Sequence, residues 1–382
     1  MKPNNVFELI KLSLWGEGNP TVDLSVYQEM KSHAIATLPA SVLSSLNLTP
    51  DLMKEWRNTV LQQIAFFTNY QDVQSHLPID VPYVILKGTS AAQYYPYPEY
   101  RTLGDIDIIT RREDYHAACQ AMLKKGWNET TSKADQERGR HRSFEQKGII
   151  VEIHAFFASM NDLKKAKVFD DLVISNITEN HILPDMVNGL VLLDHVNQHM
   201  EQGIGLKQII DWMMFVDRCL TDDKWIEFES LVAKTGLKEL AITMTKMCEI
   251  YLGLPRRKWC MGADEKLTRD LMEYIMKCGN FGNKLNQTDT LYVSGLYQLR
   301  HPIMTIRDLQ QKGLGNAVIA RNPILRPFAW FAEGWRRIIK TPDKLEKYRN
   351  ARKTNALFKS LGVSRSVDGL VYYADGRYYK QQ

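Results

Sequence analysis

Residues 81–110 of this 382-residue chain read VPYVILKGTSAAQYYPYPEYRTLGDIDIIT. The apolar run 81–88 is closed by Gly88 and is typical of a buried strand, and residues 89–95 resemble a short helix. In residues 105–110 acidic and apolar side chains alternate at first, which indicates a strand with one polar face. The segment therefore predicts a strand, a tight turn, a short helix and a second strand, in that order.

The elements that follow complete a small mixed domain. Residues 113–127 have the amphipathic pattern of a helix that ends at Gly126. Residues 142–157 predict a hairpin whose turn lies at Lys147-Gly148. Strands and helices that alternate in this way are typical of a small α/β or α+β unit. We predict an α+β fold, with a small mixed-sheet core between N- and C-terminal helical regions.

Helical patterns surround this core. Thr49-Pro50-Asp51 is a typical helix start, and the apolar spacing after it predicts an amphipathic helix that ends before Pro78. Helical patterns resume at Pro184 and continue to about residue 300. We divide the chain into an N-terminal helical region, a core, a helical domain and a basic helical tail with turn signals for a terminal hairpin: residues 1–79, 80–183, 184–311 and 312–382.

The composition is that of an ordinary globular protein, with 44% hydrophobic residues and a net charge of +5. It excludes a mostly disordered chain, a collagen-like fibre and a disulfide scaffold. Residues 312–382 hold fifteen Lys and Arg against five acids, so this tail carries +10 and the rest of the chain −5. Such a tail suits nucleic acid, anionic lipid or a phosphorylated ligand, or is simply a solvated helix face. We favour packed core for its aromatic residues Trp330, Phe331 and Trp335.

The sequence predicts neither a secretory signal nor a membrane span. We find no signal peptide, no run of 18 apolar residues and no CxxC pair among the five cysteines. These features predict a cytoplasmic protein with reduced thiols and no membrane span.

Three carboxylates stand out in the core. Asp105 and Asp107 are two apart in a predicted strand, so their side chains point to one face and repel each other unless a cation lies between them. Mg²⁺, or Mn²⁺, suits this position because it prefers oxygen ligands and accepts substrate phosphates. If the strand of Glu152 pairs beside residues 105–110, a third carboxylate joins the site, and three carboxylates can hold two metal ions.

The turn at Gly88 predicts a phosphate site. It follows an apolar strand and precedes a helix, so its backbone N–H groups can face an anion. The candidate side-chain donors for the phosphates are Lys87, Thr89, Ser90 and Arg101.

These motifs resemble the DNA polymerase beta-like nucleotidyltransferase superfamily. The pattern LKGTSAAQYY, then RTLGDIDIIT, then VEIHAFF looks more narrowly like a poorly characterised bacterial nucleotidyltransferase family in which a Lys-Gly opens the turn. The later segment DHVNQHMEQGIGLKQIIDW looks like the helical half of that family. The resemblance covers roughly residues 80–215.

The resemblance implies a role for each motif. Asp105 and Asp107 would bind the metal, Glu152 would be the third acid, and Gly88 with Thr89 would form the phosphate-binding turn. The sequence departs from the superfamily pattern at Thr89, which usually is Ser, and in having Glu rather than Asp as the third acid.

Structural interpretations stay open for the same residues. Asp105 can cap a turn, Glu152 can form a cross-strand salt bridge, and Lys87 can pair with one of the acids instead of a phosphate. Arg140, His141 and Arg142, at the start of the hairpin, are weaker candidates for contact with a triphosphate.

Four further residues are candidates for supporting or substrate-facing roles. His195 and His199 are four apart and share a helix face, where we favour packing or a polar network over a substrate role. His154 should point to the same face as Glu152 and can orient a metal ligand. Lys207 and Asp211 are also four apart, which predicts an ion pair within one helix, although both can line the cleft.

The first hypothesis is an enzyme that moves a nucleoside monophosphate from an NTP, such as ATP, to a hydroxyl acceptor and releases pyrophosphate. The acceptor, whether protein, RNA or small molecule, is not defined by the sequence. Two alternatives remain: a non-catalytic nucleotide-binding or regulatory module of the same fold, and an adaptor that binds RNA through the basic tail.

Overall fold

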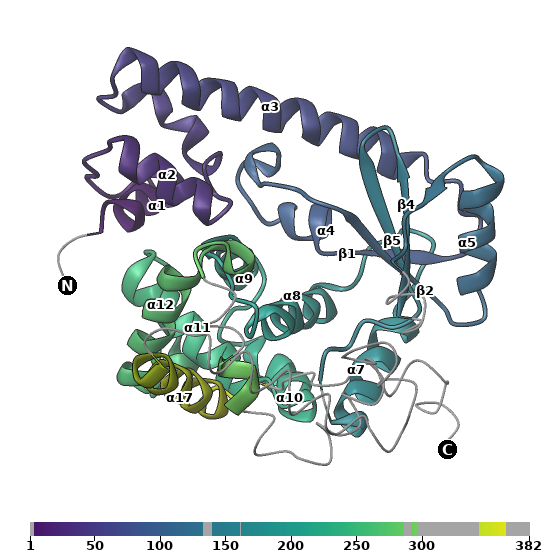
Figure 1. Cartoon of the computed structure of the whole chain (residues 1–382). Coiled ribbons are helices and arrows are strands. Elements are labelled where there is room, and N and C mark those ends of the chain that lie inside the picture. Colours follow the sequence, from purple (N-terminus) through teal and green to yellow (C-terminus); the bar gives the residue numbers. More distant parts are fainter. Residues whose placement is uncertain (1–3, 133–139, 161, 286–291, 297–343, 364–382) are drawn as a thin grey trace.

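A computed structural model describes residues 4–132, 140–160, 162–285, 292–296 and 344–363. This part of the chain contains a five-stranded sheet in the order β1-β2-β5-β4-β3, with helices before and after it (Figure 1). The predicted α+β fold, a small mixed sheet flanked by helical regions, is confirmed. The strands are β1 (Tyr83–Leu86), β2 (Ile106–Thr110), β3 (Asn128–Glu129), β4 (His141–Gln146) and β5 (Ile149–His154).

The sheet is mixed because β2 and β5 run parallel, whereas the other neighbours are antiparallel. A parallel pair needs a long connection, and here the connection contains helix α5 (Tyr115–Lys124) and strands β3 and β4. The predicted hairpin is β4–β5. Its turn residues Lys147 and Gly148 have φ of 53° and 73°, the left-handed conformation that a two-residue hairpin turn favours.

The two faces of the sheet belong to different hydrophobic clusters. Ile106 and Ile108 of β2 pack in a cluster with α5 and the end of the long helix before the sheet. Ile109 belongs to the other cluster, which is dominated by the N- and C-terminal helices. Because side chains alternate along a strand, Asp107 shares the face of Ile109 and is directed to the side of the C-terminal helices.

The N-terminal region is helical, as predicted. The Thr49 hydroxyl accepts from the Leu52 amide, and Pro50 is the first helical residue of a 26-residue helix, which lies along the top of Figure 1. The elements before the sheet are α1 (Asn5–Trp15), α2 (Leu24–Ser32), η1 (Leu38–Ser41), η2 (Leu43–Ser45) and α3 (Pro50–Ser75). Between β1 and β2 lie α4 (Gly88–Ala92) and η3 (Pro98–Tyr100).

The helices after the sheet form the second half of the molecule. Helix α8 is buried on nearly all sides, and its buried polar residues Asn188, Asp194 and Asn197 form hydrogen bonds there. The helical elements are α7 (Leu163–Ser175), α8 (Asp185–His199), α9 (Leu206–Arg218), α10 (Trp225–Thr235), α11 (Lys238–Tyr251), η4 (Lys258–Cys260), α12 (Glu265–Cys278), η5 (Asn280–Gly282) and α17 (Lys344–Ser360).

Helix α17 is the part of the basic tail that the structure describes best. Its Phe358 is buried and meets Tyr274 of α12 edge to face, with the ring centroids 5.3 Å apart. Trp330, Phe331, Trp335 and the predicted terminal hairpin lie outside the described residues, and the four domain boundaries stay predictions.

Two further expectations concern the whole chain. No helix among the described residues is long and apolar enough to cross a membrane. All five cysteines are free and buried.

Candidate active site

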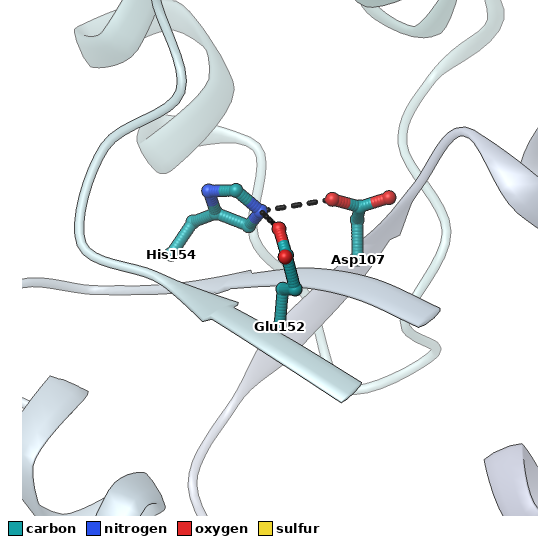
Figure 2. A group of neighbouring side chains, drawn as sticks. All are labelled: Asp107, Glu152 and His154. Carbon is teal, nitrogen blue, oxygen red and sulfur yellow. Dashed lines mark hydrogen bonds and ion pairs between the residues drawn. The ribbon is translucent and has the colours of Figure 1, made fainter. Parts of the chain in front are cut away.

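Neighbouring strands bring two of the predicted carboxylates together. Asp107 on β2 and Glu152 on β5 are direct register partners, and His154 lies two residues after Glu152 on the same face. One potential ligand atom from each of the three residues lies within 4.8 Å of the other two. Figure 2 shows the three side chains converging above the two strands.

Basic groups hold both oxygens of Asp107. His154 Nε2 lies 2.9 Å from Asp107 Oδ1, and Lys87 Nζ lies 2.8 Å from Oδ2. His154 Nε2 is also 3.5 Å from Glu152 Oε2. Asp107 itself is 1% exposed, so these contacts replace nearly all of its hydration.

These contacts set the protonation of the cluster. Burial opposes ionisation of Asp107, but the Lys87 ammonium and the His154 imidazole hold the pKa of Asp107 well below its usual range. Burial likewise opposes ionisation of Glu152, and His154 lowers its pKa. Despite burial, Asp107 raises the pKa of His154. The cluster therefore keeps its carboxylates ionised at neutral pH.

Asp105 lies at the edge of this cluster. It is exposed, directly before β2, and the charge of Asp107 is the main cause that raises the pKa of Asp105. Its ligand atoms are outside the group formed by Asp107, Glu152 and His154. Metal binding by Asp105 stays a prediction, while His154, predicted as a supporting residue, is one of the three clustered groups.

The donor set fits a divalent metal ion. Two ionised carboxylates on one sheet face offer the oxygen ligands that Mg²⁺ and Mn²⁺ prefer. An imidazole beside them is a second kind of ligand, which Mg²⁺ uses less readily than transition metals do. The group could therefore hold a metal ion, through Asp107 and Glu152 first.

Helix α3 braces the turn at Gly88. The Tyr70 hydroxyl donates to the Asp105 carbonyl at 3.0 Å, and a Cβ on Gly88 would lie 2.4 Å from the same hydroxyl. Gly88 also has φ of 42°, so a side chain there meets both a steric and a backbone penalty. The glycine is needed for this close approach of α3.

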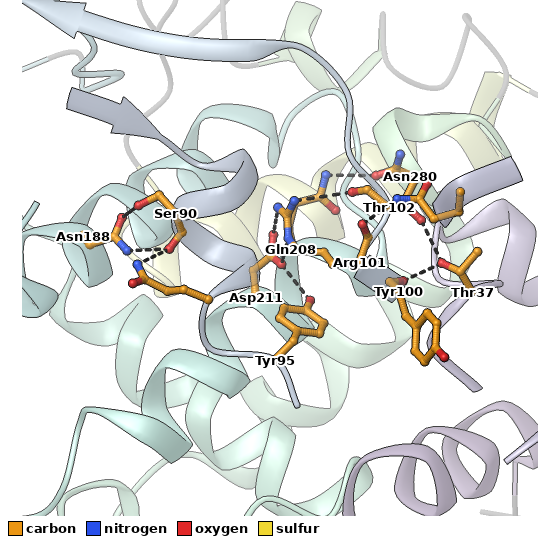
Figure 3. Close-up of polar contacts among 12 residues, drawn as sticks. Thr37, Ser90, Tyr95, Tyr100, Arg101, Thr102, Asn188, Gln208, Asp211 and Asn280 are labelled. Atoms are coloured by element: carbon orange, nitrogen blue, oxygen red, sulfur yellow. Dashed lines mark hydrogen bonds and ion pairs between the residues drawn. The ribbon is translucent and has the colours of Figure 1, made fainter. Parts of the chain in front are cut away.

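The hydroxyls predicted to bind phosphate make other contacts. Thr89 donates to Gln74 of α3 at 2.7 Å, and Ser90 donates to Asn188 of α8 at 2.8 Å (Figure 3). Both hydroxyl protons are thus used to fix the turn between α3 and α8. The remaining donors are the backbone N–H groups at the start of α4, which have no partner within the helix.

Arg101 lies in a second buried cluster. Its guanidinium donates to both oxygens of Asp211 on α9, at 2.6 and 2.7 Å, and the Tyr95 hydroxyl donates to Asp211 at 2.7 Å (Figure 3). A nucleotide phosphate would have to break this buried ion pair to reach Arg101. The predicted pairing of Lys207 with Asp211 is wrong, because Arg101 takes the carboxylate.

His195, His199 and Lys207 lie on α8 and α9, on the side of the helical half that faces the cluster. The rings of His195 and His199 are 4.9 Å apart, and among the described residues Lys207 Nζ has no ion pair within 4 Å. Burial and then the Lys87 charge lower the pKa of His195 far below its usual value and that of His199 to about 4. Burial and then Arg101 lower the pKa of Lys207 to about 8.

The weaker triphosphate candidates have protein partners. Arg142 forms two hydrogen bonds with Glu129, His141 Nε2 is 3.5 Å from Glu152, and Arg140 donates to the Phe157 carbonyl. Sequence reasoning missed Tyr70, Gln74 and Asn188, which fix the turn from other helices. The spacing of Tyr70 and Gln74, four apart on α3, was the only signal that they share a face.

More than half of the chain matches a known protein family. Residues 22–253 match the model of a family described as uncharacterised nucleotidyltransferase. The chain belongs to this nucleotidyltransferase family. It has no match among curated proteins, and none among solved structures.

The match shows which elements the nucleotidyltransferase unit includes. It extends from α2 through α11 and so contains α3, the whole sheet and the helices that carry His195 and Lys207. It is wider on both sides than the residues 80–215 that the motifs indicated. The helices that brace the turn are therefore part of the nucleotidyltransferase, not additions to it.

Proposed function

We propose that this nucleotidyltransferase moves a nucleoside monophosphate from an NTP to a hydroxyl acceptor. The acceptor oxygen attacks the α-phosphorus, the bond from that phosphorus to the bridging oxygen breaks, and pyrophosphate leaves. The observation that carries the proposal is the register pairing of Asp107 with Glu152 on the face directed to the helical half. ATP is the donor we expect.

The carboxylates are the proposed metal ligands. Asp107 and Glu152 would hold Mg²⁺ or Mn²⁺, His154 would orient Asp107 through its 2.9 Å contact, and exposed Asp105 would add a further carboxylate. A divalent ion in that position supplies Lewis-acid stabilisation of the charge that develops on the transferred phosphate.

Other residues of the chain would bind and orient the donor. The backbone N–H groups of the Gly88–Thr89 turn would face the phosphates, and Lys87 directly precedes this turn. Lys207 is half-buried and forms no ion pair within 4 Å among the described residues, so it offers a positive charge from the helical side, where His195 and His199 also lie. Ser90 and Arg101 hold the turn and the helical half together instead.

The acceptor stays open among a protein, an RNA and a small molecule. An RNA partner for the basic tail is likewise only a proposal, since most of that tail lies outside the described residues. We also propose, from the sequence pattern, a division into four domains: 1–79, 80–183, 184–311 and 312–382.

A transfer assay tests the proposal. The protein is incubated with Mg²⁺ or Mn²⁺, with each of the four NTPs labelled at the α-phosphate, and with protein, RNA and small-molecule fractions of a cell extract. We expect label in one fraction and release of pyrophosphate with wild type, and neither with Asp107→Asn. Glu145→Gln, an exposed carboxylate on β4, is the matched control and should transfer normally.

Two results would contradict the proposal. Transfer by Asp107→Asn at the wild-type rate would place the chemistry elsewhere. Tight NTP binding by wild type without any labelled product would favour the non-catalytic nucleotide-binding module.

A further inference from the structure

Lys87 has a backbone conformation that only glycine adopts without cost. It has φ of 54° and ψ of −138°, at the point where β1 ends and the turn begins. Residues with a Cβ rarely occupy this region, and where they do, the surrounding structure has to enforce the conformation. A glycine would fit this position better, so the Lys87 side chain must offset the strain.

Within the described part of the chain, the ammonium of Lys87 has one close acidic partner. Nζ lies 2.8 Å from Asp107 Oδ2, the side chain is 13% exposed, and the amine is 5.3 Å from the centre of the Phe157 ring. His154 contacts the other oxygen of Asp107. Both oxygens of the carboxylate at the centre of the proposed metal group therefore already bind a basic side chain.

A divalent cation on Asp107 would meet this ammonium at close range. Two cations on one carboxylate repel each other, and in a buried site water screens that repulsion poorly. Metal binding to Asp107 thus requires Lys87 to move its charge to another anion. The backbone of the turn starts at Lys87 itself, so a phosphate bound over Gly88 and Thr89 would be the nearest new partner.

We propose that Lys87 is an internal counter-ion that shields Asp107 and passes from this carboxylate to a phosphate of the NTP when metal and nucleotide bind. The inference rests on the proposed function and adds that metal and nucleotide bind cooperatively. Neither ligand binds tightly alone. The metal alone would displace the Lys87 ammonium from Asp107 without offering it another anion, and the nucleotide alone would draw that ammonium away and leave Asp107 without it. Nucleotide and metal together satisfy both charges, so each strengthens the binding of the other by the same factor.

The chain provides a matched control for the backbone. Lys147 also has a positive φ, of 53°, and its Nζ lies 3.4 Å from Asp72, but its side chain is 63% exposed and lies in the hairpin turn before β5, with no ion pair to Asp107. Lys147→Gly likewise places glycine at a positive-φ lysine and removes an ion pair, but an exposed one. Any effect specific to Lys87→Gly is then due to its place beside Asp107.

Isothermal titration of the full-length protein with Mn²⁺ alone tests the inference. We expect Lys87→Gly and Lys87→Met to bind Mn²⁺ roughly 10-fold or more tightly than wild type, and Lys147→Gly to match wild type. With a non-hydrolysable ATP analogue present, Mn²⁺ affinity should rise in wild type by a factor roughly 10 times larger than in the Lys87 variants, in which only the direct contact between phosphates and metal couples the two ligands. Lys87→Met keeps the backbone strain, so agreement between the two variants assigns the effect to the charge.

Two outcomes overturn the inference, and they are distinguishable. If wild type binds the analogue and Mn²⁺ without mutual strengthening, or if the Lys87 variants bind Mn²⁺ no more tightly than wild type, the exchange is wrong while the proposed function stands. The absence of mutual strengthening in wild type overturns the exchange even if both variants fail to fold. If wild type binds no nucleotide with or without Mn²⁺, the proposed function falls and the exchange falls with it.

Discussion

Two buried aspartates, Asp107 and Asp211, each bind a basic side chain in this protein, and the partners differ in kind. Asp211 faces the rigid fork of Arg101, with both oxygens bonded, and the Tyr95 hydroxyl completes its contacts (Figure 3). Asp107 faces the flexible ammonium of Lys87 and the imidazole of His154, with Glu152 beside it (Figure 2). One arginine neutralises Asp211, whereas Asp107 has a second carboxylate, Glu152, beside it.

The difference separates an anchor from a binding site. An arginine fork that is bidentate on a buried carboxylate loses much if it moves, and this one joins the segment before β2 to α9. A lysine ammonium is a point charge on a flexible stem and can change partner. The first cluster suits stability, and the second suits the exchange of cations and phosphates.

The largest expected effect is on stability at the anchor. Asp211→Asn leaves the Arg101 charge buried without its carboxylate, and we expect the free energy of unfolding to fall by about 3–5 kcal/mol. Urea unfolding measures this, with Asp72→Asn on the exposed side of α3 as the control, expected within about 0.5 kcal/mol of wild type. Equal effects of the two variants would show that Asp211 is no anchor.

Glu152→Gln should reduce catalysis much more than stability, in contrast to Asp211→Asn. Despite burial, His154 holds the pKa of Glu152 below its usual value, so the ionised carboxylate stabilises the fold at neutral pH and its loss should lower the free energy of unfolding, though by less than Asp211→Asn does. Nucleotidyl transfer should fall by about 100-fold, equivalent to about 2.7 kcal/mol, because a proposed metal ligand is lost. A destabilised protein with normal transfer would make Glu152 a structural residue like Asp211.

Lys207 lies between the two clusters and should link stability to pH. Burial and Arg101 lower its pKa to about 8, against about 10.4 in an unfolded chain. The unfolded chain binds the extra proton between about pH 8 and pH 10, so the stability of wild type rises with pH in that window. Below pH 8 the whole penalty for the buried charge is present.

The matching variant is Lys207→Met. At pH 7 we expect it to be more stable than wild type by about 1–3 kcal/mol, with an advantage that shrinks between pH 8 and pH 10. Urea unfolding at pH 7, 8, 9 and 10 measures the difference. The charged groups that act on Lys207 are Arg101, Asp211, Asp105 and Lys87, and a variant less stable than wild type at pH 7 would mean that the acids outweigh burial.

The smallest effect is expected at the brace between α3 and the turn. Tyr70→Phe removes the hydrogen bond to the Asp105 carbonyl and should lower the free energy of unfolding by about 1 kcal/mol. Thermal unfolding in the presence and absence of nucleotide measures both this loss and any change in ligand stabilisation. No change in either would show that packing of the ring alone holds the turn.

The sequence predicted the features that depend on local pattern. The period-two alternation around Asp107 and the turn signal at Lys147-Gly148 both appear in the structure as expected, and the pairing of β2 with β5 meets the condition set for Glu152. Partners far apart in the chain left no such pattern. Arg101 and Asp211 are 110 residues apart, and the four-residue spacing of Lys207 favoured the wrong partner because a buried bidentate pair outweighs a contact along one helix.

The same reason explains the site residues. A strand pattern shows that Glu152 and His154 share a face, but not that His154 contacts Asp107. The hydroxyls of Thr89 and Ser90 were expected to face phosphate, yet their partners Gln74 and Asn188 come from helices whose packing no local pattern defines. Lys87 had two interpretations, an ion pair or a phosphate contact, and its strained backbone is visible only in three dimensions.

The most direct test of the account is a crystal structure of the full-length protein grown with Mn²⁺ and a non-hydrolysable ATP analogue, with anomalous scattering used to find the metal. We predict a Mn²⁺ peak in contact with the carboxylates of Asp107 and Glu152, beside the phosphates of the analogue. The analogue bound over Gly88 and Thr89 with no metal at these two carboxylates, or Mn²⁺ bound only elsewhere, would contradict it.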